Sequence, residues 1–241
     1  MRLLVTRPEP DASRTAERLR SAGHEAIVEP LLAAVAAPVP DIGIAPAALA
    51  VTSRNAVRAL LNWPQVADWR QRVTVFAVGD ATAAAARAAG FADVRSAEGD
   101  VDDLVRLIVR ERRAVAGSVL YVAGEVRRGD LGGGLRAAGI SVAEVEAYRM
   151  QPAAVLSEAL TLRLRGGALD GALFYSERTA AVFADLVGEA PLGTVTAYAL
   201  SAAAALPLDS LGFRSVAIAS RPNEDALFAL IPRSAEKAPS A

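Results

Sequence analysis

The chain has 241 residues, of which 53% are hydrophobic, a length that suits one large domain or two small ones. Its 26 Lys and Arg residues almost balance its 27 Asp and Glu residues, so we expect neither nucleic acid nor an anionic membrane as a partner. There is no cysteine and only one histidine, which argues against disulfides, thiol nucleophiles, metal centres and redox cofactors.

The chain opens on MRLLVTRPEP, whose apolar run is too short for a signal peptide or a membrane span, and this predicts a cytoplasmic protein. Short apolar runs then alternate with Ala-rich helical patterns. The runs predict strands buried on both faces, at Leu3–Val5, Leu49–Val51, Val73–Val78, Val119–Val122, Ala172–Phe174, Val195–Leu200 and Val216–Ala219. Helices are predicted between them, among them Asp11–Ala22 and one capped by Asp100. This alternation is typical of an α/β protein with parallel sheets.

An internal repeat indicates how these elements are grouped. The strand, serine and helix that begin at Val51 recur at Phe174, with Ser53 and Ser176 separated by 123 residues. A third element, the strand Val119–Val122 with its helix, resembles the strand Leu3–Val5 with its own. That element ends one copy, but in the other copy it lies at the start of the chain.

The permuted order predicts two similar parallel-sheet, flavodoxin-like domains, with the second inserted into the first. Domain 1 would combine residues 1–33 with 152–231, and domain 2 would span 39–145. The crossings at 32–39 and 145–152 are predicted to pair as a two-stranded hinge, and the tail 232–241 to be disordered.

Candidate binding residues follow several of the predicted strands. Ligands of open parallel sheets bind beyond the carboxyl ends of the strands, near free backbone N–H groups, and small polar residues there suit carboxylate or phosphate. We expect these positions to line one cleft between the domains. The candidates are Arg7, Thr52, Ser53, Asn55, Gly79, Thr82, Gly124, Ser176 and Ser201.

Each candidate also has a structural interpretation. Ser53, Asn55 and Ser176 are residue types that begin helices, and Gly79 and Gly124 suit tight turns. No GxGxxG or GxxxxGKS motif accompanies them, so the sequence does not favour a dinucleotide or P-loop site. The run Gly132–Gly134 inside a helical pattern has no assigned role. Tyr148, at a domain crossing, is either a packing residue or a phenol that donates a proton to a departing hydroxyl.

Taken together, these motifs resemble the uroporphyrinogen-III synthase family over nearly the whole chain. The residues on which the resemblance rests are Leu3–Pro8, Leu19 with Gly23-His24, Val51–Val57, Val75–Gly79 with Thr82, Tyr148, Phe174–Ser176, and Ala219–Pro222 with Leu227. The resemblance implies two domains joined by a two-stranded ladder. It also implies a cofactor-free lyase that cyclises hydroxymethylbilane to uroporphyrinogen III, with inversion of ring D and loss of water, in haem biosynthesis.

By this resemblance Tyr148 would assist departure of the hydroxyl, and Thr52, Ser53, Ser176, Ser201 and Arg7 would hold acetate and propionate arms. Many members carry Arg-Gly where this chain has Ala123-Gly124, so Arg127 or Arg128 would supply that guanidinium. We expect a monomer that acts on a small molecule. The alternative is a non-catalytic anion-binding or regulatory module with the same two-domain fold.

Overall fold

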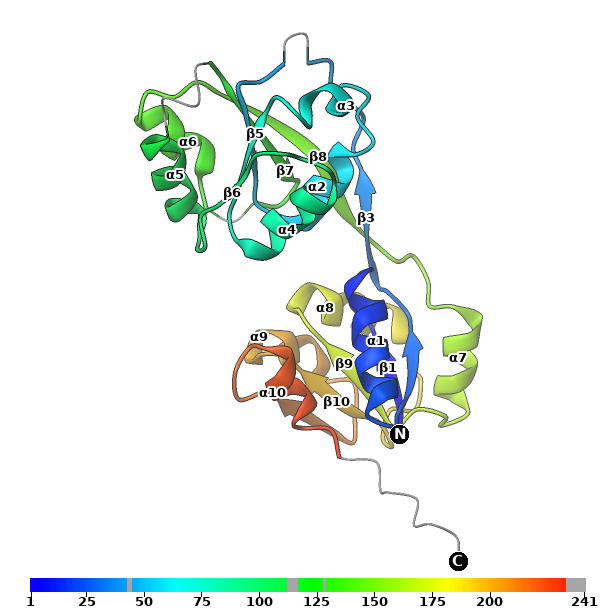
Figure 1. Cartoon of the computed structure of the whole chain (residues 1–241). Helices are drawn as coiled ribbons and strands as arrows, with labels where there is room; N and C mark the ends of the chain where they lie inside the picture. Colours follow the sequence, from blue (N-terminus) through cyan, green and yellow to red (C-terminus); the bar gives the residue numbers. More distant parts are fainter. Residues whose placement is uncertain (43–44, 112–116, 128, 233–241) are drawn as a thin grey trace, which may run out of the picture. The chain divides into compact units, whose positions relative to one another are not determined.

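The computed structural model describes residues 1–42, 45–111, 117–127 and 129–232. The chain divides into two compact units, which we take one at a time (Figure 1). Unit 1 combines Met1–Ala33 with Gln151–Ala241, and unit 2 is Ala34–Met150. All of the tail predicted to be disordered, except Pro232, lies outside the described residues.

Unit 1 contains a five-stranded sheet in which every pairing is parallel. In chain order its strands are β1 (Arg2–Val5), β2 (Glu25–Val28), β9 (Gly171–Phe174), β10 (Thr196–Ala199) and β11 (Ser215–Ile218). In space they run β11-β10-β9-β1-β2, which is the 2-1-3-4-5 order of flavodoxin-like proteins.

Helices cover both faces of the unit 1 sheet. They are α1 (Asp11–Ser21), α7 (Glu158–Arg165), α8 (Glu177–Val187), α9 (Ala202–Ala205), the 3-10 turn η2 (Leu206–Leu208) and α10 (Glu224–Phe228). Successive side chains of a strand point to opposite faces. Leu3 and Val5 of β1 therefore pack with residues of α1 and α10, whereas Leu4 packs with residues of α7 and α8.

Unit 2 contains a six-stranded sheet. Its strands are β3 (Leu32–Ala36), β4 (Ala48–Val51), β5 (Thr74–Ala77), β6 (Val94–Ser96), β7 (Val119–Gly124) and β8 (Val142–Pro152), in the spatial order β3-β8-β7-β4-β5-β6. The pairings from β8 to β6 are parallel. The two crossing segments are themselves strands, since β3 and β8 are hydrogen-bonded neighbours in this sheet.

The helices of unit 2 are α2 (Arg54–Leu60), α3 (Val66–Trp69), α4 (Asp80–Ala88), α5 (Val101–Arg110) and α6 (Leu131–Ala137). Helices α2 and α4 pack on the face that carries Leu49 and Val51, and α5 and α6 on the face that carries Ala48 and Ala50 (Figure 1). The alanines of α4 bring it close to its neighbours, and Ala83 and Ala86 are fully buried.

The two sheets have the same strand order once the permutation is taken into account. The series β8-β7-β4-β5-β6 of unit 2 matches β2-β1-β9-β10-β11 of unit 1, position by position. The element that closes unit 2, β7 with β8, therefore corresponds to β1 with β2 at the start of the chain. The predicted fold class, two similar parallel-sheet domains of α/β type, is confirmed.

The glycine run that sequence analysis left unassigned lies in α6, beside α5. A Cβ on Gly134 would meet Val105 Cγ2 of α5 at 2.8 Å, so the glycine allows the two helices to approach closely. Asp130 begins α6, and its side chain accepts a hydrogen bond from the Gly133 N–H at 2.7 Å. The run is therefore explained by the packing of α6 in unit 2.

Candidate functional site

The three predicted serines occupy equivalent positions at the carboxyl ends of strands. Ser53, Ser176 and Ser201 all have extended backbones and begin helices α2, α8 and α9. Their hydroxyls accept hydrogen bonds from the N–H groups of Ala56, Thr179 and Ala204 at 3.0, 3.2 and 3.3 Å. Helix capping thus accounts for their residue type, but an accepting hydroxyl keeps its own proton to donate.

Tyr148 lies in the long strand β8, beside the end of β7. Ala123 pairs with Glu146 and Gly124 with Tyr148, so Ala147 is an extra residue that forms a β-bulge. Ala147 and Tyr148 consequently pack against the same hydrophobic cluster, which strict alternation along a strand would prevent. The bulge directs the half-buried tyrosine ring back toward β7 and α2.

Two neighbours of Tyr148 define the position of its phenol. Tyr148 Oη lies 2.9 Å from Ser53 Oγ, so the two hydroxyls share a hydrogen bond. A Cβ on Gly124 would lie 2.6 Å from Tyr148 Cζ and 2.9 Å from Oη, closer than real contacts allow. Gly124 is therefore the residue that lets the ring lie against the β7 backbone.

Other predicted residues of unit 2 lie around this pair. Thr52 Oγ1 is 3.3 Å from Tyr121 Oη, and Asn55 Nδ2 donates to Met150 Sδ at 3.8 Å. Gly79 begins α4 after the adjacent strand β5, and a Cβ there would have nothing within 4 Å. Thr82 is buried in the first turn of that helix. The carboxyl edge of the unit 2 sheet therefore carries hydroxyl, amide and open backbone groups together.

The corresponding edge of unit 1 is organised around a carboxylate that sequence analysis did not single out. Glu224 Oε1 accepts hydrogen bonds from Thr15 Oγ1 at 2.6 Å, Tyr175 Oη at 2.8 Å and Arg7 Nη1 at 3.1 Å. Arg18 also pairs with this carboxylate. Glu224 is distant in sequence from all four partners, and its only signal was its place after Asn223, a residue type that begins helices.

Arg7, expected to face an anion from outside the chain, is paired within it. Its guanidinium contacts Asp11 and Glu224, both at 3.1 Å, and its Cζ lies 4.1 Å above the centre of the Tyr175 ring. Because α1 and α10 supply these carboxylates, the charge of Arg7 holds two helices of unit 1 together. The other guanidinium candidates differ: Arg127 pairs with Glu144, and Arg128 lies outside the described residues.

Burial and hydrogen bonding shift the pKa values of both acidic groups in this network. Burial raises the pKa of Tyr175, and the neighbouring Glu224 raises it further. Burial also disfavours the ionised form of Glu224, but hydrogen bonds from Thr15, Tyr175 and Arg18 outweigh it and lower the pKa of Glu224. Glu224 is thus ionised and accepts hydrogen bonds, and Tyr175 uses its proton to donate one of them.

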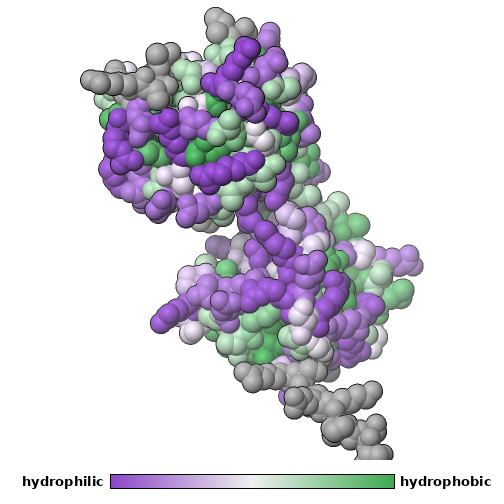
Figure 2. All heavy atoms as spheres, in the orientation of Figure 1, coloured by the Kyte–Doolittle hydropathy of each residue, from purple (hydrophilic) through white to green (hydrophobic). Residues whose placement is uncertain are grey.

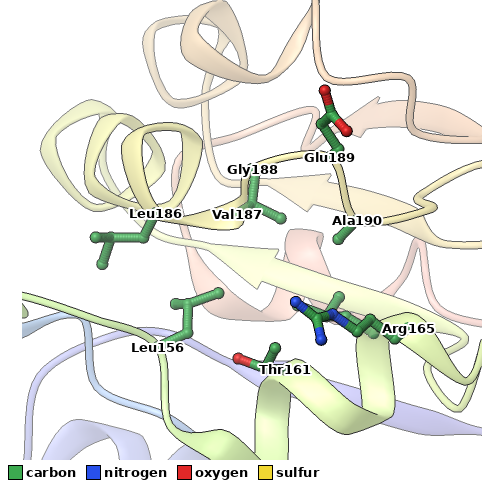
Figure 3. Close-up of a pocket in the computed structure, with 9 residues that line it drawn as sticks. Leu156, Thr161, Arg165, Leu186, Val187, Gly188, Glu189 and Ala190 are labelled. Atoms are coloured by element: carbon green, nitrogen blue, oxygen red, sulfur yellow. The ribbon is translucent and has the colours of Figure 1, made fainter.

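Unit 1 also contains a cavity of about 430 Å³ between α7 and the end of α8 (Figure 3). It is lined by Leu156, Thr161, Leu164, Arg165, Leu186, Val187, Gly188, Glu189 and Ala190. Helix α8 begins at the carboxyl edge of the sheet, so its last residues lie toward the opposite edge. None of the predicted site residues lines this cavity.

A metal centre and a membrane-spanning helix are both absent from the described residues. Within these ranges no group of three or more His, Asp and Glu side chains is placed to bind a metal ion. No helix in the described part of the chain is long and apolar enough to cross a membrane. In the view of Figure 2 hydrophilic side chains predominate, and apolar ones gather over α7, where Val155 and Leu162 are exposed.

These features define a duplicated α/β protein, with one flavodoxin-like unit inserted into another and polar groups at the carboxyl edge of each sheet. The family model for uroporphyrinogen-III synthase HemD matches residues 13–229, and the chain belongs to this family. The enzyme class predicted from the sequence, a lyase of tetrapyrrole biosynthesis, is confirmed by that membership.

Solved structures share the fold. Uroporphyrinogen-III synthetase from Helicobacter pylori is 20% identical with a TM-score of 0.62, covering 95% of this chain and 98% of its own. A mutant uroporphyrinogen III synthase from Thermus thermophilus is 17% identical with a TM-score of 0.50, covering 95% and 96%. No curated protein sequence matches the chain significantly.

Proposed function

We propose that this chain cyclises hydroxymethylbilane to uroporphyrinogen III, with inversion of ring D and loss of water. Its membership of the uroporphyrinogen-III synthase family carries this proposal. In the reaction the terminal hydroxyl leaves as water and an azafulvene cation forms. A pyrrole carbon then attacks through a spiro intermediate, which inverts ring D, and the macrocycle closes with loss of a proton. We place the reaction in the cytoplasm and expect the protein to act as a monomer.

Tyr148 is the proposed proton donor. A phenol carries one proton, which it is able to give to the departing hydroxyl. The position supports this role, because Tyr148 Oη shares a hydrogen bond with the hydroxyl of Ser53 and lies at the carboxyl edge of a parallel sheet.

Hydroxyl and backbone groups are proposed to hold the acetate and propionate arms of the substrate. The residues are Thr52, Ser53, Asn55, Gly79, Thr82 and Gly124 in unit 2, with Ser176 and Ser201 in unit 1. Catalysis would then depend mainly on holding a flexible chain in the conformation that lets ring D invert. Arg7 is the least favoured of the predicted anchors, because Asp11 and Glu224 already compensate its charge.

The reaction is tested by giving the purified protein freshly prepared hydroxymethylbilane and separating the product isomers by chromatography. We expect the type III isomer in excess. The uncatalysed reaction gives the type I isomer, because ring D closes without inversion. Type I product alone would overturn the proposed function.

The role of Tyr148 is tested by Tyr148→Phe, which keeps the ring and removes the hydroxyl. We expect kcat for type III product to fall about 10²- to 10⁴-fold, the usual contribution of a general acid. The melting temperature should change little, because the ring still packs against Gly124. A variant that melts much earlier, yet keeps wild-type turnover in its folded fraction, would show that Tyr148 is only a packing residue.

A further inference from the structure

The hydrogen-bonding capacity of Ser53 limits what its hydroxyl does beside Tyr148. A serine hydroxyl has one proton and two lone pairs. The Ala56 N–H, 3.0 Å away, donates only, so it occupies one lone pair of Ser53 Oγ. The contact with Tyr148 Oη at 2.9 Å then uses either the second lone pair or the single proton of Ser53.

The two arrangements have different consequences for the phenol. If Tyr148 donates to Ser53, the phenolic proton is held inside the protein and cannot reach a substrate. If Ser53 donates to Tyr148, the phenolic proton is directed elsewhere and the phenolate left after transfer gains a hydrogen-bond donor. The bond that Ser53 accepts from Ala56 favours the second arrangement, because accepting a hydrogen bond polarises a hydroxyl and makes it a better donor.

The backbone around the pair keeps the two oxygens in place. Ser53 is fixed by its extended backbone and its cap at the start of α2. Tyr148 is directed toward it by the β-bulge at Ala147, and its ring lies where a side chain on Gly124 would stand. A phenol with its ring and its oxygen both held is preorganised for proton transfer.

We propose that the Ser53 hydroxyl positions the proton donor, so that a substrate carboxylate would meet the backbone N–H of Ser53 rather than its hydroxyl; this inference rests on the proposed function. The Ser53 hydroxyl donates to Tyr148 Oη and leaves the phenolic proton for the departing hydroxyl. When that proton transfers, the C–O bond breaks, water leaves with the bonding electrons, and Ser53 stabilises the phenolate. The proton that the pyrrole carbon loses as it regains aromaticity balances the one donated.

Ser53→Ala and Ser53→Thr test this inference. Ser53→Ala removes the donor, and we expect kcat to fall about tenfold, as for the loss of one hydrogen bond to a charged group, with KM within about twofold of wild type. Ser53→Thr keeps a hydroxyl at the cap and should restore most of kcat. A rise in KM with unchanged kcat would overturn the inference, because it would show that Ser53 only binds a substrate carboxylate.

A double-mutant cycle separates the inference from the proposed function. In a Tyr148→Phe background, Ser53→Ala should lower kcat no further, since Ser53 would then have no phenol to position. If Tyr148→Phe lowers kcat but Ser53→Ala does not, the inference fails and the proposed function stands. If Tyr148→Phe has wild-type kcat, the proposed role of Tyr148 fails, and the inference about Ser53 fails with it.

Ser157→Ala is the matched control for the loss of a helix cap. Ser157 begins α7 in unit 1 and accepts from the Leu160 N–H at 3.2 Å, as Ser53 does from Ala56. The Ser157→Ala variant should be less stable than the wild type but should have the same kcat and KM.

A readout independent of turnover is the ¹³Cζ chemical shift of labelled Tyr148, which should move in Ser53→Ala and return in Ser53→Thr. An unmoved signal would mean that the two hydroxyls do not interact, and would overturn the inference.

Discussion

The tyrosines at the carboxyl edges of the two sheets are held in different ways. In unit 2, Tyr148 Oη lies beside the hydroxyl of Ser53, and its ring lies against the backbone at Gly124. In unit 1, Tyr175 Oη donates to the carboxylate of Glu224 and its ring lies under the guanidinium of Arg7. The serines that begin α2 and α8 nevertheless have nearly the same backbone angles in the two units.

This difference shows how a duplicated framework comes to carry two kinds of polar site. A phenol that donates to a carboxylate has committed its proton, and burial raises the pKa of Tyr175 further, so this tyrosine is suited to structure. A phenol beside a neutral hydroxyl is instead able to give its proton to a substrate, as proposed for Tyr148. Both units have a serine that caps the helix. They differ because β8 supplies Tyr148 in unit 2, whereas α10 supplies Glu224 in unit 1.

Gly124→Ala should break the unit 2 arrangement and has the largest expected effect of the substitutions that compare the two units. A Cβ at this position would stand 2.6 Å from Tyr148 Cζ, so the ring must move by several tenths of an ångström or more. We expect a cost of about 1–3 kcal/mol in the free energy of unfolding and a fall in kcat of about 10- to 100-fold. Urea denaturation and steady-state kinetics measure the two effects.

Gly193→Ala in unit 1 is the control for adding a methyl group, because a Cβ on Gly193 would have nothing within 4 Å. It should change the free energy of unfolding by no more than the ordinary effect of a surface substitution, about 0.5 kcal/mol, and should leave kcat unchanged. Wild-type kcat and stability in Gly124→Ala would contradict the packing of the tyrosine ring against β7.

Glu224→Gln should weaken the unit 1 arrangement without touching unit 2. The amide keeps the shape of the side chain but removes the charge that Thr15, Tyr175 and two arginines contact. We expect a loss of about 1.5–3 kcal/mol in the free energy of unfolding at pH 7, the usual contribution of hydrogen bonds to a charged group. Turnover of the folded protein should persist, and its loss would show that this network belongs to the catalytic machinery.

The effect of Glu224→Gln should depend on pH in a defined direction. The pKa of Glu224 is lowered in the folded protein from an ordinary value of 4.5, so its stabilisation is complete above that value and is lost as the pH falls through the folded pKa. The difference between wild type and variant should therefore be constant near neutrality and shrink below about pH 4. Asp225→Asn is the control, because the highly exposed Asp225 pairs with Arg18 and should contribute less than about 1 kcal/mol.

Much of the fold was predictable because buried parallel strands are continuous apolar runs. All seven predicted strands are present, and the repeated pattern around Ser53 and Ser176 reveals the duplication. The strands β2 and β6 were not predicted. Both lie at sheet edges, where Glu25 or Arg95 is tolerated because one side of the strand meets solvent or a helix end, so neither forms an apolar run.

The site was less predictable, because its contacts depend on geometry that sequence spacing does not reveal. The residue types at the strand ends, and Tyr148 itself, could be singled out. The contact between Ser53 and Tyr148 joins residues 95 positions apart and depends on the bulge at Ala147. One of the two carboxylate partners of Arg7, Glu224, is 217 positions away, in a short helix whose acidic first turn looks like ordinary capping.

Gly79→Ser would make unit 2 more like unit 1 at the start of α4, and its expected effect is the smallest. Gly79 occupies the position equivalent to Ser201, with φ of −159° against −155°, but it has no side chain to cap the helix. A serine should therefore add a few tenths of a kcal/mol to the free energy of unfolding. It would also fill the space beside Gly79, where a Cβ has no neighbour within 4 Å.

If that space receives a carboxylate arm of the substrate, KM should rise severalfold while kcat is retained. Gly79→Ala separates the two contributions, because a methyl group fills space without capping, so it should raise KM with no gain in stability. Unchanged KM in both variants would show that the edge at β5 does not bind substrate. The difference between the two units would then lie in Ser53, which follows β4, and Tyr148 of β8, where the proton transfer is proposed to occur.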